Sequence, residues 1–232
     1  MSPGSSAAYH GVAIRPHDLL WVAELTALVA VDPLPLWATA EWLDGAAPVV
    51  VRRERANAFG RIPVGLRGKT RSERFKAYLA RHAIRRCVTP DMLANNAAWD
   101  RKQELEEFPP IEALIALAPL LDATGLPWGP TGSVGFALAS GLPVLRQDSD
   151  LDLVVRASKP LTPDLTEALL SIRSSTTCRI DMQIETGHGA FSFAEWVNGP
   201  RRVLLKTDIG PFLTDDPWNQ SGGMPAESTN QS

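Results

Sequence analysis

Cysteine is scarce in this 232-residue sequence, which contains only Cys87 and Cys178. Two cysteines allow one disulfide, but isolated thiols in a chain without an export signal are more often reduced, and two thiols cannot build a four-ligand zinc site. The first residues, MSPGSSAAYH, contain neither a basic start nor the apolar run that directs export. We therefore expect a cytoplasmic protein with reduced cysteines.

Long hydrophobic runs are also missing. The stretch LLWVAELTALVAV is interrupted by Glu24 and ends at Asp32-Pro33, well short of the roughly 20 apolar residues that cross a bilayer. Aromatic residues are sparse among the basic residues, where Phe59, Phe75 and Tyr78 stand nearly alone, although single-stranded nucleic acid binds on aromatic platforms. We expect a soluble protein with no membrane partner, and nucleic acid is a poor candidate partner.

Positive charge, in contrast, is concentrated in one segment. Between Arg52 and Arg86 there are twelve Lys or Arg residues against two acids, a local balance of +10 in a chain whose net charge is −3. Such a block indicates a polyanionic partner, which could be nucleic acid, a phosphate-rich small molecule or an acidic protein. The alternative is a solvated, arginine-rich helix face.

The sequence divides into two predicted domains between two tails. Residues 1–10 and 214–232 are small, polar and rich in Pro or Gly, as in disordered tails. We assign residues 11–95 to a smaller, basic N-terminal α+β domain and residues 96–213 to a catalytic domain.

Within the N-terminal domain, the pattern predicts two helices and a hairpin. A helix begins after His17-Asp18 and ends near Val31, where Asp32-Pro33 stops it. Residues 47–53 and 60–66 read as the two strands of a hairpin. Thr70-Arg71-Ser72-Glu73 has the spacing of a capping box and predicts a helix from there to about Arg86.

In the catalytic domain, helices and strands alternate. The predicted helices cover residues 111–121, 133–140 and 163–174, and the predicted strands cover 127–131, 149–156, 178–185 and 201–206. This order predicts an α/β (α+β) fold, in which helices pack on a mixed sheet.

Three acids on two of these strands are candidate metal ligands and catalytic residues. Asp150 and Asp152 are separated by one apolar residue, so that both carboxylates share one face of a strand. Carboxylates held so close repel each other unless a cation lies between them, and oxygen ligands suit Mg²⁺, with Mn²⁺ as an alternative. Asp181, on the next predicted strand, completes a three-acid site if the two strands are neighbours. A salt-bridged or exposed acid is the competing interpretation for Asp181.

Two segments are candidate phosphate-binding sites. Gly132-Ser133 lies at a predicted strand-to-helix junction, where backbone amides and a hydroxyl can hold a phosphate. Gly68-Lys69-Thr70 resembles the end of a P-loop, but Pro63 stands where that motif needs glycine. The cations Arg67, Lys69, Arg71 and Arg74 surround this segment and are candidate substrate-binding residues.

Gly-Ser followed by a helix and then Asp-x-Asp resembles the signature of the nucleotidyltransferase superfamily. Longer segments carry a more specific resemblance, to the malonate decarboxylase holo-acyl-carrier-protein synthase family, also called phosphoribosyl-dephospho-CoA transferase. These segments are PHDLLWV, IPVGLRGKTRSERF, WGPTGSVGFALASGLPVLRQDSDLDLVVRA and RIDMQIET. The resemblance spans nearly the whole chain except the tails. It implies a small N-terminal domain and a C-terminal nucleotidyltransferase fold, with the catalytic acid pair at Asp150 and Asp152.

The resemblance also implies a reaction. The donor would be 2′-(5″-triphosphoribosyl)-3′-dephospho-CoA, and the acceptor a serine of the acyl-carrier subunit of malonate decarboxylase, with release of pyrophosphate. In such a reaction Asp181 would bind an ion or accept the proton, and the basic segment would bind either substrate phosphate or the carrier. Two alternatives stay open: a nucleotidyltransferase that uses an ordinary nucleoside triphosphate on an acceptor such as RNA, and a non-catalytic carrier-binding module.

Overall fold

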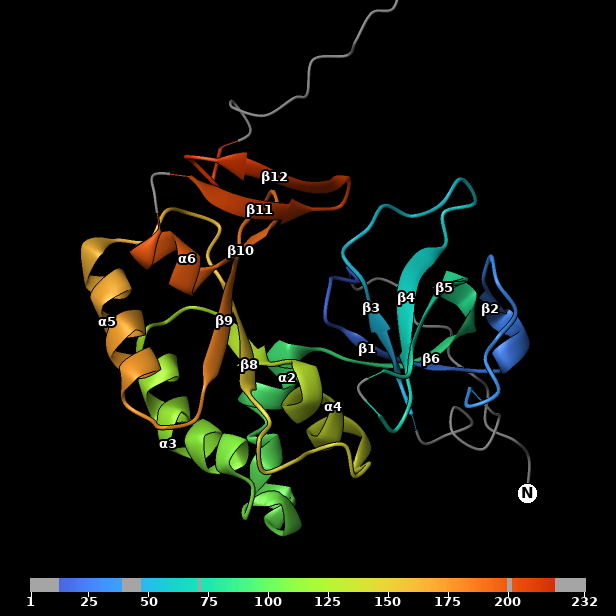
Figure 1. Cartoon of the computed structure of the whole chain (residues 1–232), viewed down its shortest axis with the longest axis horizontal. Coiled ribbons are helices and arrows are strands. Elements are labelled where there is room, and N and C mark those ends of the chain that lie inside the picture. Colours follow the sequence, from blue (N-terminus) through green and yellow to red (C-terminus); the bar gives the residue numbers. More distant parts are fainter. Residues whose placement is uncertain (1–12, 39–46, 71, 200–201, 220–232) are drawn as a thin grey trace, which may run out of the picture.

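The computed structural model describes residues 13–38, 47–70, 72–199 and 202–219. These residues form two lobes, each built on its own six-stranded sheet (Figure 1). None of the helices in the described ranges is long and apolar enough to cross a membrane.

The N-terminal lobe is a small antiparallel barrel. Its strands are β1 (Leu19–Val22), β2 (Leu28–Val29), β3 (Val49–Val51), β4 (Ile62–Arg67), β5 (Arg74–Leu79) and β6 (Ile84–Val88). They pair in the order β2-β5-β4-β3-β1-β6. The two edge strands of this order, β2 and β6, are continuations of strands inside it. β2 follows β1 after the 3-10 turn η1 (Leu25–Ala27), and β6 follows β5 after the 3-10 turn η2 (Arg81–Ala83). The sheet therefore closes on itself.

This lobe confirms the predicted hairpin, since β3 and β4 pair antiparallel with Val50 opposite Gly65. The two predicted helices, from after Asp18 to about residue 31 and from 70 to about 86, are wrong. All four residues of β1 are buried, and strands on both sides pair with it. In β5, the exposed Arg74 and Lys76 alternate with residues that face inward, and β4 pairs along its whole length.

The Thr-x-x-Glu spacing has a different role from the one predicted. The backbone N–H of Thr70 donates to Oε2 of Glu73 at 2.8 Å, and the N–H of Gly68 donates to the carbonyl of Glu73 at 2.8 Å. These contacts close the turn between β4 and β5 rather than start a helix. Local spacing was misleading here because a capping box and a tight turn use the same side-chain-to-backbone bond.

The C-terminal lobe combines a mixed sheet with helices, which confirms the predicted α+β class. Its strands are β7 (Trp128–Pro130), β8 (Leu151–Arg156), β9 (Ile180–Glu185), β10 (Ala190–Ser192), β11 (Val203–Thr207) and β12 (Gly210–Thr214). Its helices are α2 (Pro90–Asn95), α3 (Pro109–Ala123), α4 (Gly132–Ser140), α5 (Pro163–Ser174) and α6 (Phe193–Asn198), with 3-10 turns η3 (Ala98–Arg101) and η4 (Gln103–Leu105).

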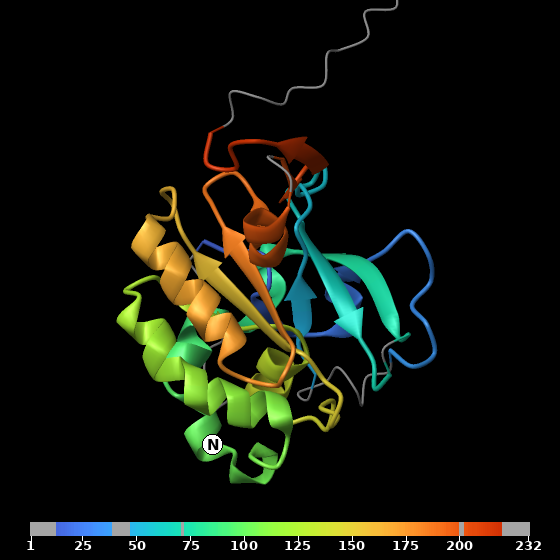
Figure 2. The same cartoon turned by 60° about the vertical axis from the view of Figure 1, so that its left-hand side comes forward.

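The sheet order is β12-β11-β10-β9-β8-β7. β8 and β9 run parallel, joined by a crossover through α5, and the other neighbouring strands described pair antiparallel. Helices α3 and α5 cover one face, against which Leu151, Leu153 and Val155 are buried (Figure 2). The residues that alternate with them, beginning with Asp152, point to the opposite face.

The lobes meet close to residue 89. The barrel ends at Val88, and α2 packs against β7 so tightly that a Cβ on Gly129 would lie 2.1 Å from the carbonyl oxygen of Pro90. At the other end, residues 214–219, which the sequence assigned to a tail, pack against the C-terminal lobe. The Trp218 indole donates to the carbonyl of Ala157 at 2.9 Å and contacts the ring of Phe191. Residues 1–10 and 220–232 lie outside the described ranges.

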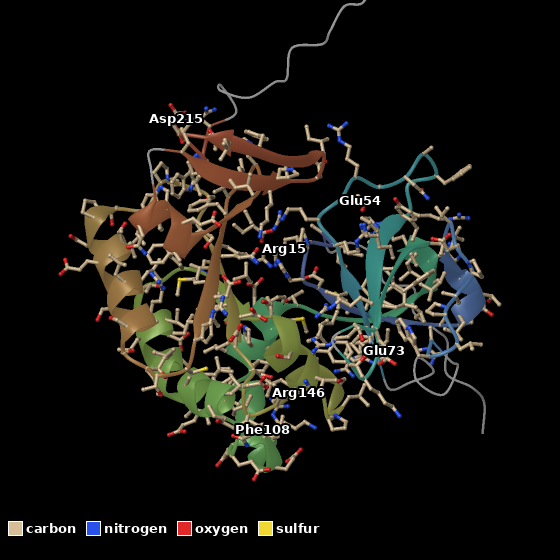
Figure 3. All side chains as sticks on the ribbon, in the orientation of Figure 1. Arg15, Glu54, Glu73, Phe108, Arg146 and Asp215 are labelled. Atoms are coloured by element: carbon tan, nitrogen blue, oxygen red, sulfur yellow. The ribbon has the colours of Figure 1, made fainter. Side chains whose placement is uncertain are left out.

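A chain of ion pairs joins the lobes at the end of the sheet where β8 and β9 finish. From the barrel side, Arg15 contacts Asp91 at 2.5 Å and Arg53 contacts Glu185 at 2.6 Å. Between them, Arg156 contacts both Asp91, at 3.0 Å, and Glu185. Figure 3 shows Arg15 at the junction of the lobes. Arg156, which shares partners with both barrel arginines, thus connects the barrel to the end of the sheet.

Candidate active site

The two acid-bearing strands are neighbours, as the three-acid hypothesis required. In the parallel pairing of β8 with β9, Asp152 lies directly opposite Asp181. Asp150 lies just before β8 and two residues from Asp152, which gives it the same facing. Strand alternation and register therefore bring all three carboxylates to the sheet face that looks toward the barrel.

Mutual repulsion among these acids is visible in their electrostatics. Burial, followed by the charges of Asp181 and Asp150, raises the pKa of Asp152 to about 6. The nearby guanidinium groups of Arg67 and Arg74 act in the opposite direction and lower it. Asp150 has a cation of its own, because Arg179 lies 3.7 Å away. The site thus concentrates negative charge that a cation would relieve.

The donor chemistry of this site fits a divalent cation held together with substrate. Carboxylate oxygens are hard ligands of the kind that Mg²⁺ prefers, and Mg²⁺ is commonly bound by one or two carboxylates and substrate phosphates. Within the described residues, however, no three His, Cys, Asp or Glu side chains converge closely enough to enclose an ion. Phosphate oxygens of a substrate would have to complete the coordination shell.

Gly132 and Ser133 lie at the start of α4, beside the acids. The φ angle of Gly132 is +57°, and a Cβ there would lie 1.7 Å from Oδ2 of Asp152. The backbone N–H of Thr131 donates to the carbonyl of Asp152 at 2.8 Å, and the Thr131 side chain does not cap the helix. The first backbone N–H groups of α4 therefore lie next to the carboxylates, where they can donate hydrogen bonds to an anion.

The barrel contributes cations to the same place. Arg67 and Arg74 are directly opposite each other across β4 and β5, and the charges of both act on Asp152. Arg67 is buried, with its guanidinium 5.3 Å from the centre of the Phe136 ring on α4. Each guanidinium carries a planar fork of N–H donors that matches phosphate geometry, so this pair can hold an anion between the lobes.

The remaining basic candidates are less central. Lys69 is exposed at the β4–β5 turn and does not line the cavity described next. Arg71 lies outside the described residues.

A cavity of about 370 Å³ extends from Gly132 into the space between the lobes. Its lining combines apolar side chains with cations, among them Leu19, Leu66, Phe75, Leu93 and Phe136, and Arg52, Arg67, Arg74 and Lys76. A mixed lining of this kind is typical of pockets for organic anions. The sequence interpretation missed Arg52, Lys76 and Phe136. The alternation of Arg74 with Lys76 was a usable signal, because it places both on one face of a strand.

His17 also lines this cavity and was not predicted as a site residue. Its φ angle is +74°, which is uncommon for a residue other than glycine. Burial, and then the charges of Arg53, Arg156 and Lys206, lower its pKa to about 4. His17 is therefore neutral near pH 7 and adds a polar but uncharged group to the cavity wall.

Comparison with known proteins covers both lobes. The family model "Phosphoribosyl-dephospho-CoA transferase MdcG N-terminal domain" matches residues 15–90, and the model for the C-terminal domain of the same family matches residues 94–217.

Individual relatives carry the same name. The chain is 44% identical to a phosphoribosyl-dephospho-CoA transferase of Pseudomonas putida strain GB-1 over 206 residues, which are 89% of this chain and 96% of the relative. It is 42% identical to the one from Klebsiella pneumoniae strain 342, with coverage of 89% and 97%. Among solved structures there is no match.

Proposed function

Because this chain belongs to the phosphoribosyl-dephospho-CoA transferase family, we propose that it attaches the phosphoribosyl-dephospho-CoA group to a serine of the acyl-carrier subunit of malonate decarboxylase. The donor is 2′-(5″-triphosphoribosyl)-3′-dephospho-CoA. The observation that carries the proposal is the pairing of Asp152 with Asp181 on one lobe, opposite the Arg67–Arg74 pair of the other. Acids that attract a cation, facing arginines that attract phosphate, suit a triphosphate substrate.

The reaction exchanges one phosphorus–oxygen bond for another. The serine oxygen forms a bond to the α-phosphorus of the triphosphate, and the bond from this phosphorus to the bridging oxygen of the β-phosphate breaks. Pyrophosphate leaves with the electron pair, and the serine hydroxyl loses its proton to a base. A serine hydroxyl is a weak nucleophile near neutral pH, so activation of the hydroxyl and stabilisation of the leaving group both matter.

In this proposal the three carboxylates have two roles, to hold a metal ion and to accept a proton. Asp150 and Asp152 hold Mg²⁺, or Mn²⁺, together with the triphosphate oxygens. When bound, the ion neutralises phosphate charge and lowers the barrier to nucleophilic attack. Asp181 is exposed beside them and takes up the proton of the acceptor hydroxyl.

The cations and amides hold the donor. The N–H groups at Gly132 and Ser133 donate to phosphate oxygens at the start of α4. Arg67 and Arg74 contact the departing pyrophosphate, because each carries a fork of donors that matches phosphate geometry. The cavity behind them, with Phe75 and Phe136 in its lining, receives the dephospho-CoA part. Lys69, exposed at the turn between β4 and β5, adds to the positive charge of the barrel.

Intact-mass spectrometry of the apo carrier subunit tests this function. The enzyme, Mg²⁺ and the triphosphoribosyl donor should increase the carrier mass by that of the phosphoribosyl-dephospho-CoA group, with one pyrophosphate released per carrier. A carrier whose acceptor serine is replaced by alanine is the matched control and should stay unchanged. The proposal fails if the carrier mass is unchanged while labelled ATP or CTP is incorporated into RNA, which would indicate the nucleoside triphosphate alternative.

A further inference from the structure

A second cavity, of about 510 Å³, lies on the other side of Asp181. Asp181, Gln183 and Ser192 line it from β9 and β10, and Lys206 lines it from β11. In the sheet order β7-β8-β9-β10-β11, the acids on β8 and β9 therefore separate two cavities. The one described above begins at Gly132, which follows β7, and the second continues toward β11.

We infer that this second cavity and the adjoining face of the β11–β12 hairpin form the docking surface for the acceptor protein. The inference rests on the proposed function. In phosphoryl transfer the attacking and leaving oxygens lie roughly in line, on opposite sides of the phosphorus. The arginine pair and the α4 amides occupy the β7 side of the acids, so the acceptor hydroxyl arrives from the β9 side, past Asp181.

The backbone of β9 is only partly paired with β10. Pairing between β9 and β10 ends with Gln183 opposite Ser192. Within the described residues, the first half of β9, Ile180–Met182, therefore has β8 on one side and no paired strand on the other. Unpaired strand edges are common sites at which proteins bind extended segments. A segment carrying a serine can lie along this edge with its hydroxyl next to Asp181.

The charge of the surface indicates an acidic partner. Arg173, Arg179 and Lys206 line the cavity, and the side chains of Arg179 and Lys206 are exposed. The carboxylates in the lining are Asp181, which takes the proton, and Glu195. We therefore expect the acceptor protein to carry acidic residues around its serine, because complementary charge steers association.

An exposed apolar pair lies next to this basic surface. Leu204 and Leu213 are directly opposite each other on β11 and β12, and they are 36% and 51% exposed. Leu204 is two residues from Lys206 on the same strand, so both point to the same face. Apolar side chains beside complementary charge are typical of protein interfaces. The acceptor thus covers Leu204 and Leu213 while its acidic residues contact the cations.

Two variants and one control test this surface by two readouts. Lys206→Glu and the double variant Leu204→Ser/Leu213→Ser should each raise the KM for the carrier subunit by about tenfold or more. The double variant, which changes no charge, should leave the donor KM and kcat unchanged. The affinity for apo carrier, measured by calorimetric titration without donor, should fall by the same factor. The defect of Lys206→Glu should shrink at high salt. Lys159→Glu, an equivalent reversal at an exposed loop after β8, should change none of these quantities.

The outcomes separate this inference from the function on which it rests. Thermal unfolding must first show that each variant folds like the wild type, and Lys206→Gln provides a milder change if the reversal unfolds the lobe. Unchanged carrier KM and affinity in folded variants would overturn the inference, as would a defect confined to the donor KM, while wild-type enzyme still modified the carrier. If wild-type enzyme did not modify the carrier, the proposed function and the inference would fall together.

Discussion

Replacement of Gly132 by alanine is the sharpest test of the active-site geometry. The new Cβ would lie 1.7 Å from Oδ2 of Asp152, and ordinary van der Waals contact begins near 3.4 Å. The carboxylate must therefore retreat by about 1.7 Å. Displacements of about 1 Å in a catalytic site can cost on the order of 100-fold in rate, so Gly132→Ala should lower kcat by at least about 100-fold.

The variant should also be less stable, because alanine at a positive φ costs about 1–2 kcal/mol. Gly141 allows this cost to be separated from the collision. It ends the same helix with a φ of +72°, and its added Cβ would meet only the flexible end of Lys102, at 3.1 Å. Gly141→Ala should show a similar loss of stability with near wild-type turnover.

Both variants should be compared by thermal unfolding and by the rate of pyrophosphate release with donor and carrier present. If Gly132→Ala turned over as fast as Gly141→Ala, the contact between Gly132 and Asp152 would have no catalytic meaning. The assignment of Asp152 to the reacting centre would then be refuted.

Three further predictions address other charges. Asp150→Asn and Asp152→Asn should each abolish carrier modification in the mass assay without unfolding the protein, because loss of a like charge relieves repulsion. Asp181→Asn should slow carrier modification severely. Near-normal turnover in any of these variants would remove that residue from the mechanism. Arg67→Ala should raise the donor KM by about 10- to 100-fold, as expected for loss of a charged hydrogen bond of about 1.5–3 kcal/mol, whereas a salt-sensitive rise in the carrier KM alone would assign it to docking. Burial raises the pKa of Asp18 from 3.8 to about 6. The protonated form of Asp18 therefore stabilises the fold most below pH 3.8, and this contribution is lost as the pH rises through 6. In chemical unfolding measured from pH 4 to 8, Asp18→Asn should reduce that loss of stability by up to about 3 kcal/mol, and parallel pH profiles for the variant and the wild type would contradict the assignment.

Several elements followed from local sequence alone. The Asp-x-Asp spacing on a β-branched run placed Asp150 and Asp152 on one face, because side chains alternate along a strand. Pro163 and the periodic residues after it predicted α5 correctly. In these places local propensity and tertiary packing favour the same structure, so a short window of sequence was sufficient.

Local pattern failed in the basic segment. The capping-box spacing at Thr70 and Glu73 predicted a helix, yet the segment is a strand hairpin. What decides between the two is pairing with β4 and with β2, a strand more than forty residues earlier in the chain. A window of sequence does not contain such partners, and backbone groups take the conformation in which distant strands satisfy them.

The sequence by itself therefore determined the family resemblance, the shared facing of Asp150 and Asp152, and the glycine at the start of α4. Tertiary structure alone decided that Asp181 lies opposite Asp152, that Arg67 and Arg74 reach the acids from another lobe, and that a second cavity opens beside Asp181. The physical reason is that these arrangements depend on contacts between residues far apart in the sequence. A crossover through α5 sets the register of β9 against β8, and ion pairs such as Arg53 with Glu185, which are 132 residues apart, connect the barrel to the sheet.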